Sequence, residues 1–185
     1  MKGIGDTIGD IIGEKDMDLA GRLWKASETD NLAHSKFLRQ ILLSVDITAP
    51  LYFWSEMDTY KIGTTANSES TMHKLTKDAK SLSLDDFELN GDGKMDGYIL
   101  HVIDALQAVS AAEYASEVER LRHLKQMLPT SYMQKRHWTA NYEVVRNIYN
   151  QRKNHRLREW NTDFVNWVIS LPYSDDFITR DIKSE

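Results

Sequence analysis

The sequence contains no cysteine among its 185 residues. It therefore has no disulfide, no thiol nucleophile and no thiolate metal ligand, and this composition suits a reducing compartment. No apolar stretch approaches the roughly 20 residues that a transmembrane helix needs. The first residues also lack the basic region and the long apolar core of a secretory signal peptide. We therefore expect a cytosolic protein without a membrane anchor.

The chain has no excess of positive charge. The chain has 23 lysines and arginines against 28 aspartates and glutamates, for a net charge of −5. A general nucleic-acid binder needs a basic face to neutralise backbone phosphates, so we expect no such binding. Small anionic ligands remain possible where positive charge is concentrated locally. The length and the even composition predict a single domain over residues 1–185.

What the sequence does contain is mostly helical periodicity. Apolar residues recur at helical spacing in several segments. The longest of these segments, residues 98–127, is longer than an average globular helix, so we expect a break in it near Ser110. The pattern predicts helices over residues 16–27, 33–42, 98–127, 141–151 and 160–171.

Two aromatic-rich segments predict strands. Leu51 to Trp54 follows Pro50 and is too short for a helix, so we expect a buried strand there, and residues 131–139 predict another. Together these patterns predict an α/β (α+β) fold, with about five or six helices around a small, mainly antiparallel sheet that includes residues near 47–55. The polar stretch 74–89 is expected to cover a site rather than to form core.

The segment that follows Trp54 reads DTYKIGTTANSESTMH, residues 58–73. It gathers small hydrogen-bonding side chains around Gly63, where a missing side chain lets backbone N–H groups approach a ligand. One interpretation is an ordinary polar surface loop. The other is a loop that holds phosphates or the edge of a ring, with Lys61 as its only cation.

This segment resembles the signature loop of flavin-dependent thymidylate synthases. In that family an Arg-His-Arg triplet is followed by a run of small residues, an Asn, and a Ser three residues later. Thr59-Tyr60-Lys61 stands in place of the triplet, Asn67 in place of the Asn and Ser70 in place of the Ser. One extra residue separates the triplet from the Asn, and both arginines of the triplet are replaced, which predicts weakened flavin binding.

A second segment, residues 128–152, is similar to the family's strand that ends in Thr-x-Asn and leads into a helix closed by an Arg. Asn141, Arg146 and Arg152 match that pattern. His34 matches a family histidine that lies shortly before a phenylalanine and contacts flavin. The family's last nucleotide-reading Arg has no certain counterpart, and Arg158 is our candidate.

The resemblance implies a divergent, phage-like member of the family. It would methylate, or otherwise modify, dUMP or a related pyrimidine deoxynucleotide with FAD, NADPH and methylenetetrahydrofolate, in a homotetramer whose sites lie between subunits. The implied flavin-binding residues are His34, Tyr60, Lys61, Asn67 and Asn141. The implied nucleotide-binding residues are Trp54, Ser70, Arg146, Arg152 and Arg158, of which Ser70 and Arg152 are the catalytic candidates.

Charge patterning adds one observation. Between residues 134 and 158 the only acidic residue is Glu143, whereas seven residues are basic: Lys135, Arg136, Arg146, Arg152, Lys153, Arg156 and Arg158. One interpretation is a basic helix face balanced by the acidic residues of the preceding helix. The other is a phosphate pocket, for which arginine forks are suited. On the second interpretation we expect Lys61, Asn67, Ser70, Arg146 and Arg152 to converge on one anion site.

Three functions remain open. The first, which we favour, is the flavin-dependent nucleotide-modifying enzyme. The second is a catalytically silent nucleotide-binding protein that kept the fold and lost the flavin triplet. The third is a structural or partner-binding domain that is rich in helix and has no small ligand.

Overall fold

The computed structural model describes residues 13–27, 34–70, 75, 79–89, 91 and 93–180. Strands β1 (Leu42–Pro50), β2 (Thr65–Ser68) and β3 (Met133–Asn141) form one sheet in the order β1-β3-β2. Helices accompany this small antiparallel sheet, so the predicted fold class is confirmed.

The chain divides into two compact units. The first unit consists of Met1–Ile47, Tyr60–Ala66 and His137–Glu185, and the second of Thr48–Thr59 and Asn67–Arg136. Each of the three strands contributes residues to both units. The single domain expected over residues 1–185 stays a prediction.

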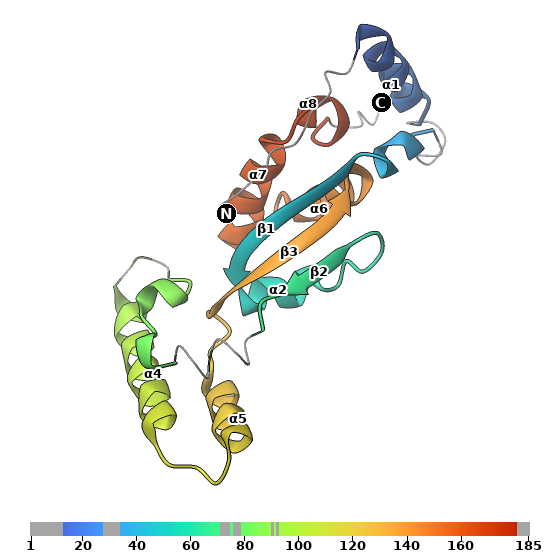
Figure 1. Cartoon of the computed structure of the whole chain (residues 1–185). Helices are drawn as coiled ribbons and strands as arrows, with labels where there is room; N and C mark the ends of the chain where they lie inside the picture. Colours follow the sequence, from blue (N-terminus) through green and yellow to red (C-terminus); the bar gives the residue numbers. More distant parts are fainter. Residues whose placement is uncertain are drawn as a thin grey trace. The chain divides into compact units, whose positions relative to one another are not determined.

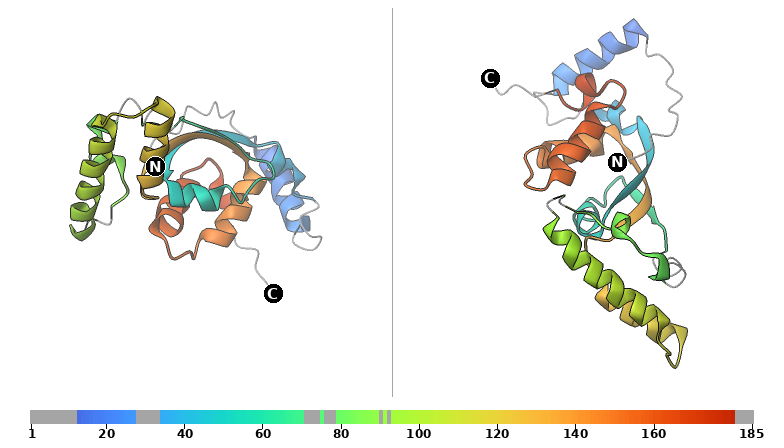
Figure 2. Two further views of the ribbon diagram at one scale, coloured as in Figure 1. Left: turned by 90° about the horizontal axis from the view of Figure 1, so that it is seen from below. Right: turned by 90° about the vertical axis from the view of Figure 1, so that its left-hand side faces the viewer.

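Helices of the first unit lie against the sheet. In both Figure 1 and Figure 2, helices α6 and α7 lie on one side of strand β3. Trp138 of β3 meets Trp167 of α7 edge-on, with ring centroids 6.3 Å apart. The helical elements of this unit are α1 (Glu14–Ser27), η1 (Lys36–Arg39), α6 (Tyr142–Arg152), a π-helical turn η4 (Glu159–Phe164), α7 (Val165–Ile169) and α8 (Ser174–Phe177).

The second unit is built around a helical hairpin. Helices α4 (Lys94–Ala111) and α5 (Glu117–Met127) lie side by side (Figure 1). They are separated by residues 112–116, which confirms the break expected near Ser110. The unit also contains α2 (Leu51–Met57), η2 (Ala79–Ser81) and η3 (Leu84–Asp86). One cluster of its buried core consists of Leu75, Ala79, Leu82, Phe87, Ile99, Ile103, Leu106, Leu124 and Tyr132.

Two predicted elements around residue 45 are wrong. The helix expected over residues 33–42 is only the short turn η1 where the structure describes it, and strand β1 begins at Leu42. Along β1, buried and exposed residues alternate, and this period of two outweighs the helical spacing of the residues before it.

The predicted strand from Leu51 to Trp54 is also wrong, because these residues open helix α2. Pro50 is the N-cap of that helix. Its backbone is still extended, with φ −67° and ψ 154°, and the helical conformation begins at Leu51. The first strand of the sheet therefore runs over residues 42–50 rather than near 47–55.

Two expectations for the polar segments also change. The described part of residues 74–89 was expected to lie outside the core, but Leu75, Ala79, Leu82 and Phe87 are buried in the core of the second unit. The segment expected as a loop after Trp54 contains strand β2, which is exposed throughout.

Among the described residues, no helix is long and apolar enough to cross a membrane.

Tyr142 ties the start of α6 to the segment after α7. It is buried, and its hydroxyl donates a hydrogen bond to the carbonyl oxygen of Pro172 at 2.8 Å. Burial raises the pKa of Tyr142 from 10.0 to about 12, because the phenolate would lose its hydration.

The raised pKa predicts a loss of stability at alkaline pH. Between pH 10 and about 12 the unfolded chain releases the Tyr142 proton whereas the folded chain keeps it, so the free energy of unfolding falls as pH rises through this window. Tyr142→Phe should remove this component and cost about 1 kcal/mol at neutral pH through the lost hydrogen bond. Urea unfolding of both proteins at several pH values measures the effect. Parallel pH profiles for the two proteins would contradict it.

Candidate functional site

The best-defined polar site in the first unit surrounds Arg152 at the end of α6. The Nε of Arg152 donates a hydrogen bond to the hydroxyl oxygen of Tyr60 at 2.8 Å, and its guanidinium carbon lies 4.7 Å from the ring centroid of Trp160. The Tyr60 hydroxyl in turn donates to Oε1 of Gln151 at 3.2 Å. We call these four residues the Arg152 cluster. The guanidinium is half-buried, and its orientation is fixed by contacts on two sides.

Local structure explains how the Arg152 cluster forms. Asn141 caps α6, with its Oδ1 accepting from the backbone N–H of Val144 at 3.0 Å. A cation such as Arg152 in the last turn also suits the helix dipole. Near Tyr60, Gly63 has a φ of +74°, and a Cβ there would lie 2.9 Å from Val144 Cγ2. A glycine therefore lets the loop that carries Tyr60 lie against the first turn of α6.

Trp160 reaches the Arg152 cluster from the π-helical turn η4. It has no exposed surface, and its ring contacts that of Phe164 at a centroid distance of 5.3 Å. A π-helical turn adds a residue to the helical repeat, and such turns are frequent at functional sites. The sequence pattern had placed Trp160 only on an apolar helix face.

The other expected site residues of the first unit are in different environments. His34 and Lys61 are exposed, and Lys61 directly follows Tyr60 in the chain. Arg158 is exposed and lies 3.6 Å from the carboxylate of Asp163. Of the residues that sequence reasoning selected in this unit, the structure brings together Tyr60 and Arg152.

Arg146 is an interior residue. Only 4% of its surface is exposed, and its guanidinium carbon lies 3.7 Å from the ring centroid of Trp24 in α1. A cation over an indole face is a favourable contact when both groups are desolvated. In this structure the Arg146 side chain therefore packs α1 against α6.

Trp54, in the second unit, is fully buried, with an exposed fraction of 0%. Its indole N–H donates to the Gln134 carbonyl at 2.9 Å, and Arg136 covers its ring at 4.4 Å from the centroid. Arg136 is held in turn by a 2.8 Å bond to Asp58. Because no ring surface is exposed, we correct the expectation that Trp54 stacks on a nucleotide; it is a core residue.

Asn67 and Ser70 are exposed residues of the second unit, in and just after strand β2. The other three members of the expected anion site, Lys61, Arg146 and Arg152, belong to the first unit. Convergence of all five residues stays a prediction.

The basic residues of segment 134–158 have different partners in the structure. Arg136 pairs with Asp58, Arg146 covers Trp24, and Lys153 lies 5.5 Å from the ring centroid of Tyr149. The seven basic residues therefore do not all belong to one pocket.

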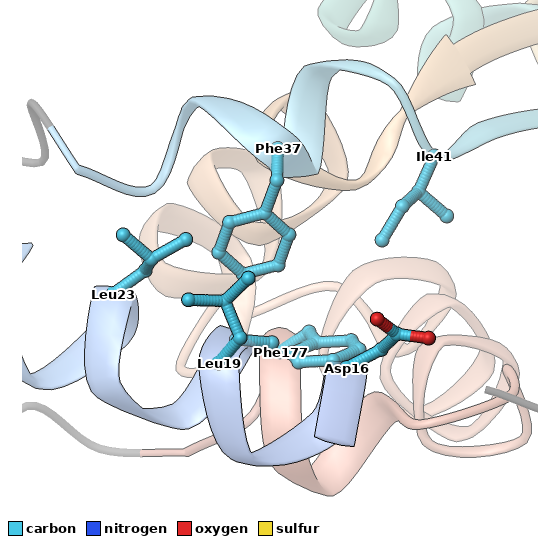
Figure 3. Close-up of a pocket in the computed structure, with 7 residues that line it drawn as sticks. Asp16, Leu19, Leu23, Phe37, Ile41 and Phe177 are labelled. Carbon is cyan, nitrogen blue, oxygen red and sulfur yellow. The ribbon is translucent and has the colours of Figure 1, made fainter. Parts of the chain in front are cut away.

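A small groove lies elsewhere in the first unit (Figure 3). Its volume is about 180 Å³, below the roughly 300–1,000 Å³ of typical small-molecule sites. Figure 3 shows apolar side chains around it, with the carboxylate of Asp16 at one end. The lining residues are Asp16, Leu19, Ala20, Leu23, Phe37, Ile41 and Phe177. An acidic, mostly apolar groove of this size does not suit a nucleotide phosphate.

The architecture is that of the flavin-dependent thymidylate synthase fold. No protein-family model matches the sequence, and a comparison with curated proteins finds no match. The structure is similar to two structures of the flavin-dependent thymidylate synthase ThyX from Helicobacter pylori with FAD and dUMP. Both have a TM-score of 0.68 and 17% identity. The similarity covers 95% and 96% of this chain, and 86% and 87% of ThyX. At 17% sequence identity, this structural similarity shows that the fold is shared.

The Arg152 cluster predicts a measurable role for the Tyr60 hydroxyl. Tyr60→Phe keeps the ring and removes the acceptor for Arg152, so the free energy of unfolding should fall by about 1 kcal/mol. Tyr149→Phe, which keeps the ring near Lys153, is the matched control and should change stability by less than about 0.5 kcal/mol. Urea unfolding measures both values. Equal effects of the two substitutions would show that the Tyr60 hydroxyl does not hold Arg152.

Proposed function

We propose that this chain is a divergent relative of flavin-dependent thymidylate synthases that binds a pyrimidine deoxynucleotide such as dUMP, with the nucleotide phosphate at Arg152. The observation that carries the proposal is the half-buried Arg152 guanidinium, held by the Tyr60 hydroxyl and the Trp160 ring. The fold adds support, because the similar ThyX structures are complexes with FAD and dUMP.

The chemistry of the Arg152 cluster suits a phosphate. A guanidinium keeps its charge at every physiological pH and forms paired hydrogen bonds with phosphate oxygens. An arginine that is already oriented loses less side-chain entropy on binding than a mobile one. Lys61, one residue after Tyr60, is exposed in the same unit and supplies a second positive charge to a chain that is acidic overall.

The described residues of the first unit do not form a complete flavin site. The hydroxyl of Tyr60 is bonded to Arg152 and Gln151, and Oδ1 of Asn141 caps α6. Of the residues standing in place of the Arg-His-Arg triplet, Lys61 alone is a cation, and a lysine cannot make the forked contacts of an arginine. These features favour nucleotide binding without flavin chemistry.

A second candidate function is the whole reaction of the resembled family. It is favoured by the extent of the structural likeness, which covers 86% of a ThyX chain whose structure holds FAD together with dUMP. On this proposal the chain methylates dUMP with FAD, NADPH and methylenetetrahydrofolate. It acts as a homotetramer, with Asn67 and Ser70 completing sites between subunits.

Nucleotide binding is tested by calorimetric titration of dUMP into the parent and into Arg152→Ala. Removing the guanidinium should cost about 2 kcal/mol, or roughly thirtyfold in Kd, the lower end of the range for a desolvated charge pair, because Arg152 is only half-buried. Arg156→Ala, which removes an exposed arginine of the same unit, is the control and should change Kd by about threefold at most. Equal affinity of the parent and Arg152→Ala for dUMP would remove Arg152 from the site.

The visible absorption spectrum separates the two candidate functions. For a silent nucleotide-binding protein we expect no bound-flavin spectrum after incubation with FAD, and no oxidation of NADPH when dUMP and methylenetetrahydrofolate are added anaerobically. The same protein should still bind dUMP. A flavin spectrum together with a methylated nucleotide product would establish the enzyme instead.

A further inference from the structure

A second polar cluster lies on the exposed face of strands β1 and β3, within the first unit. Oγ of Ser44 lies 2.7 Å from Nε2 of His137, and Nδ1 of His137 lies 2.7 Å from Oδ1 of Asp46. The serine and the carboxylate thus contact opposite nitrogens of one imidazole. We call these three residues the Ser44 cluster.

Strand geometry explains the arrangement. Leu43, Val45 and Ile47 of β1 are buried, so the alternating residues Ser44 and Asp46 lie on the opposite face. Residues two apart on one strand are roughly 7 Å from each other, which leaves room for an imidazole to bridge them from the neighbouring strand. The side chains of His137 and Asp46 are 51% and 43% exposed, so a small molecule can reach the cluster from solvent.

We propose that Ser44 is a nucleophile activated by His137 and Asp46, and that it reacts with small esters. Asp46 accepts a hydrogen bond, which places the proton of neutral His137 on Nδ1. The lone pair of Nε2 then faces the Ser44 hydroxyl and can take its proton. A base held in one tautomer by a carboxylate is the arrangement that makes a serine hydroxyl nucleophilic.

The neighbouring side chain indicates the class of ester. Leu42 lies two residues before Ser44 on the same face of β1 and is 73% exposed. An exposed leucine beside the nucleophile offers an apolar contact to a short acyl chain. We therefore expect esters with a small apolar acyl group to react better than esters with a charged one.

The reaction balances with water as the only co-reactant. The Ser44 oxygen bonds to the ester carbonyl carbon while its proton moves to Nε2 of His137. The bond between the acyl carbon and the leaving oxygen then breaks, and the departing alcohol takes the proton from Nε2. Water attacks the acyl-Ser44 ester in the same way, which releases the acid and returns the proton to Ser44.

A fluorophosphonate reagent tests the proposal on the intact chain, because it bonds to activated serines with loss of fluoride. We expect one adduct per chain, located on the Ser44 peptide by mass spectrometry, and none on Ser44→Ala. His137→Gln should slow labelling by about a hundredfold or more, the low end of what a general base contributes, and Asp46→Asn should slow it as well. Ser170→Ala, which removes a hydroxyl bonded to the Trp167 carbonyl, is the control and should label at the parent rate.

Hydrolysis of p-nitrophenyl acetate by the same proteins gives a second readout and should follow the same order. The substituted side chains are exposed, so circular dichroism should show that every variant is folded. Labelling of other serines instead of Ser44 would overturn the proposal. So would a Ser44 labelling rate that is unchanged in His137→Gln. Either result would mean that the three side chains only satisfy one another on the sheet surface.

Discussion

The fixed orientation of the Arg152 guanidinium is the constraint on which the proposed nucleotide site depends. An arginine cannot lose its charge on burial, so a half-buried guanidinium needs partners that compensate for lost water. Tyr60 supplies a hydroxyl oxygen and Trp160 supplies a ring face. These partners come from the loop after α2 and from the turn η4. One cation therefore ties α6 and the turn η4 that follows it to a loop 92 residues earlier in the chain, and the contacts that compensate for its burial also orient it.

The fold class could be predicted because several elements carry clear periodic patterns. Helices α4, α5 and α6 and strand β3 all appear where apolar spacing or aromatic content indicated them. The start of β1 could not be predicted in the same way. The apolar residues from Phe37 to Leu42 match a helical repeat that overlaps the start of the strand. The alternation of apolar and polar residues begins only at Leu43, where it follows the burial pattern of β1. At α2, the aromatic run after Pro50 fits a strand by composition, but these residues form a helix that begins directly after the extended Pro50.

Part of the candidate site could be predicted from the sequence. Tyr60 and Arg152 were selected through the family resemblance, although as ligands of different molecules, and the structure joins them directly. Trp160 and Gln151 were not selected, because both contact Tyr60, which lies 91 residues before Gln151 and about 100 before Trp160. The role of Trp54 was misjudged because the sequence around it gives no sign that Arg136 covers its ring. The Ser44 cluster was missed for a similar reason, since His137 lies 93 residues after Ser44 and 91 residues after Asp46.

The most direct test compares dUMP with deoxyuridine, which lacks the phosphate, in calorimetric titrations of the parent and of Arg152→Ala. If Arg152 holds the phosphate, the parent should prefer dUMP by about tenfold or more, and this preference should disappear in Arg152→Ala. Changing the residue and the ligand together separates the interaction between Arg152 and the phosphate from a general loss of affinity. A preference for dUMP of the same size in both proteins would place the phosphate elsewhere and contradict the proposed site.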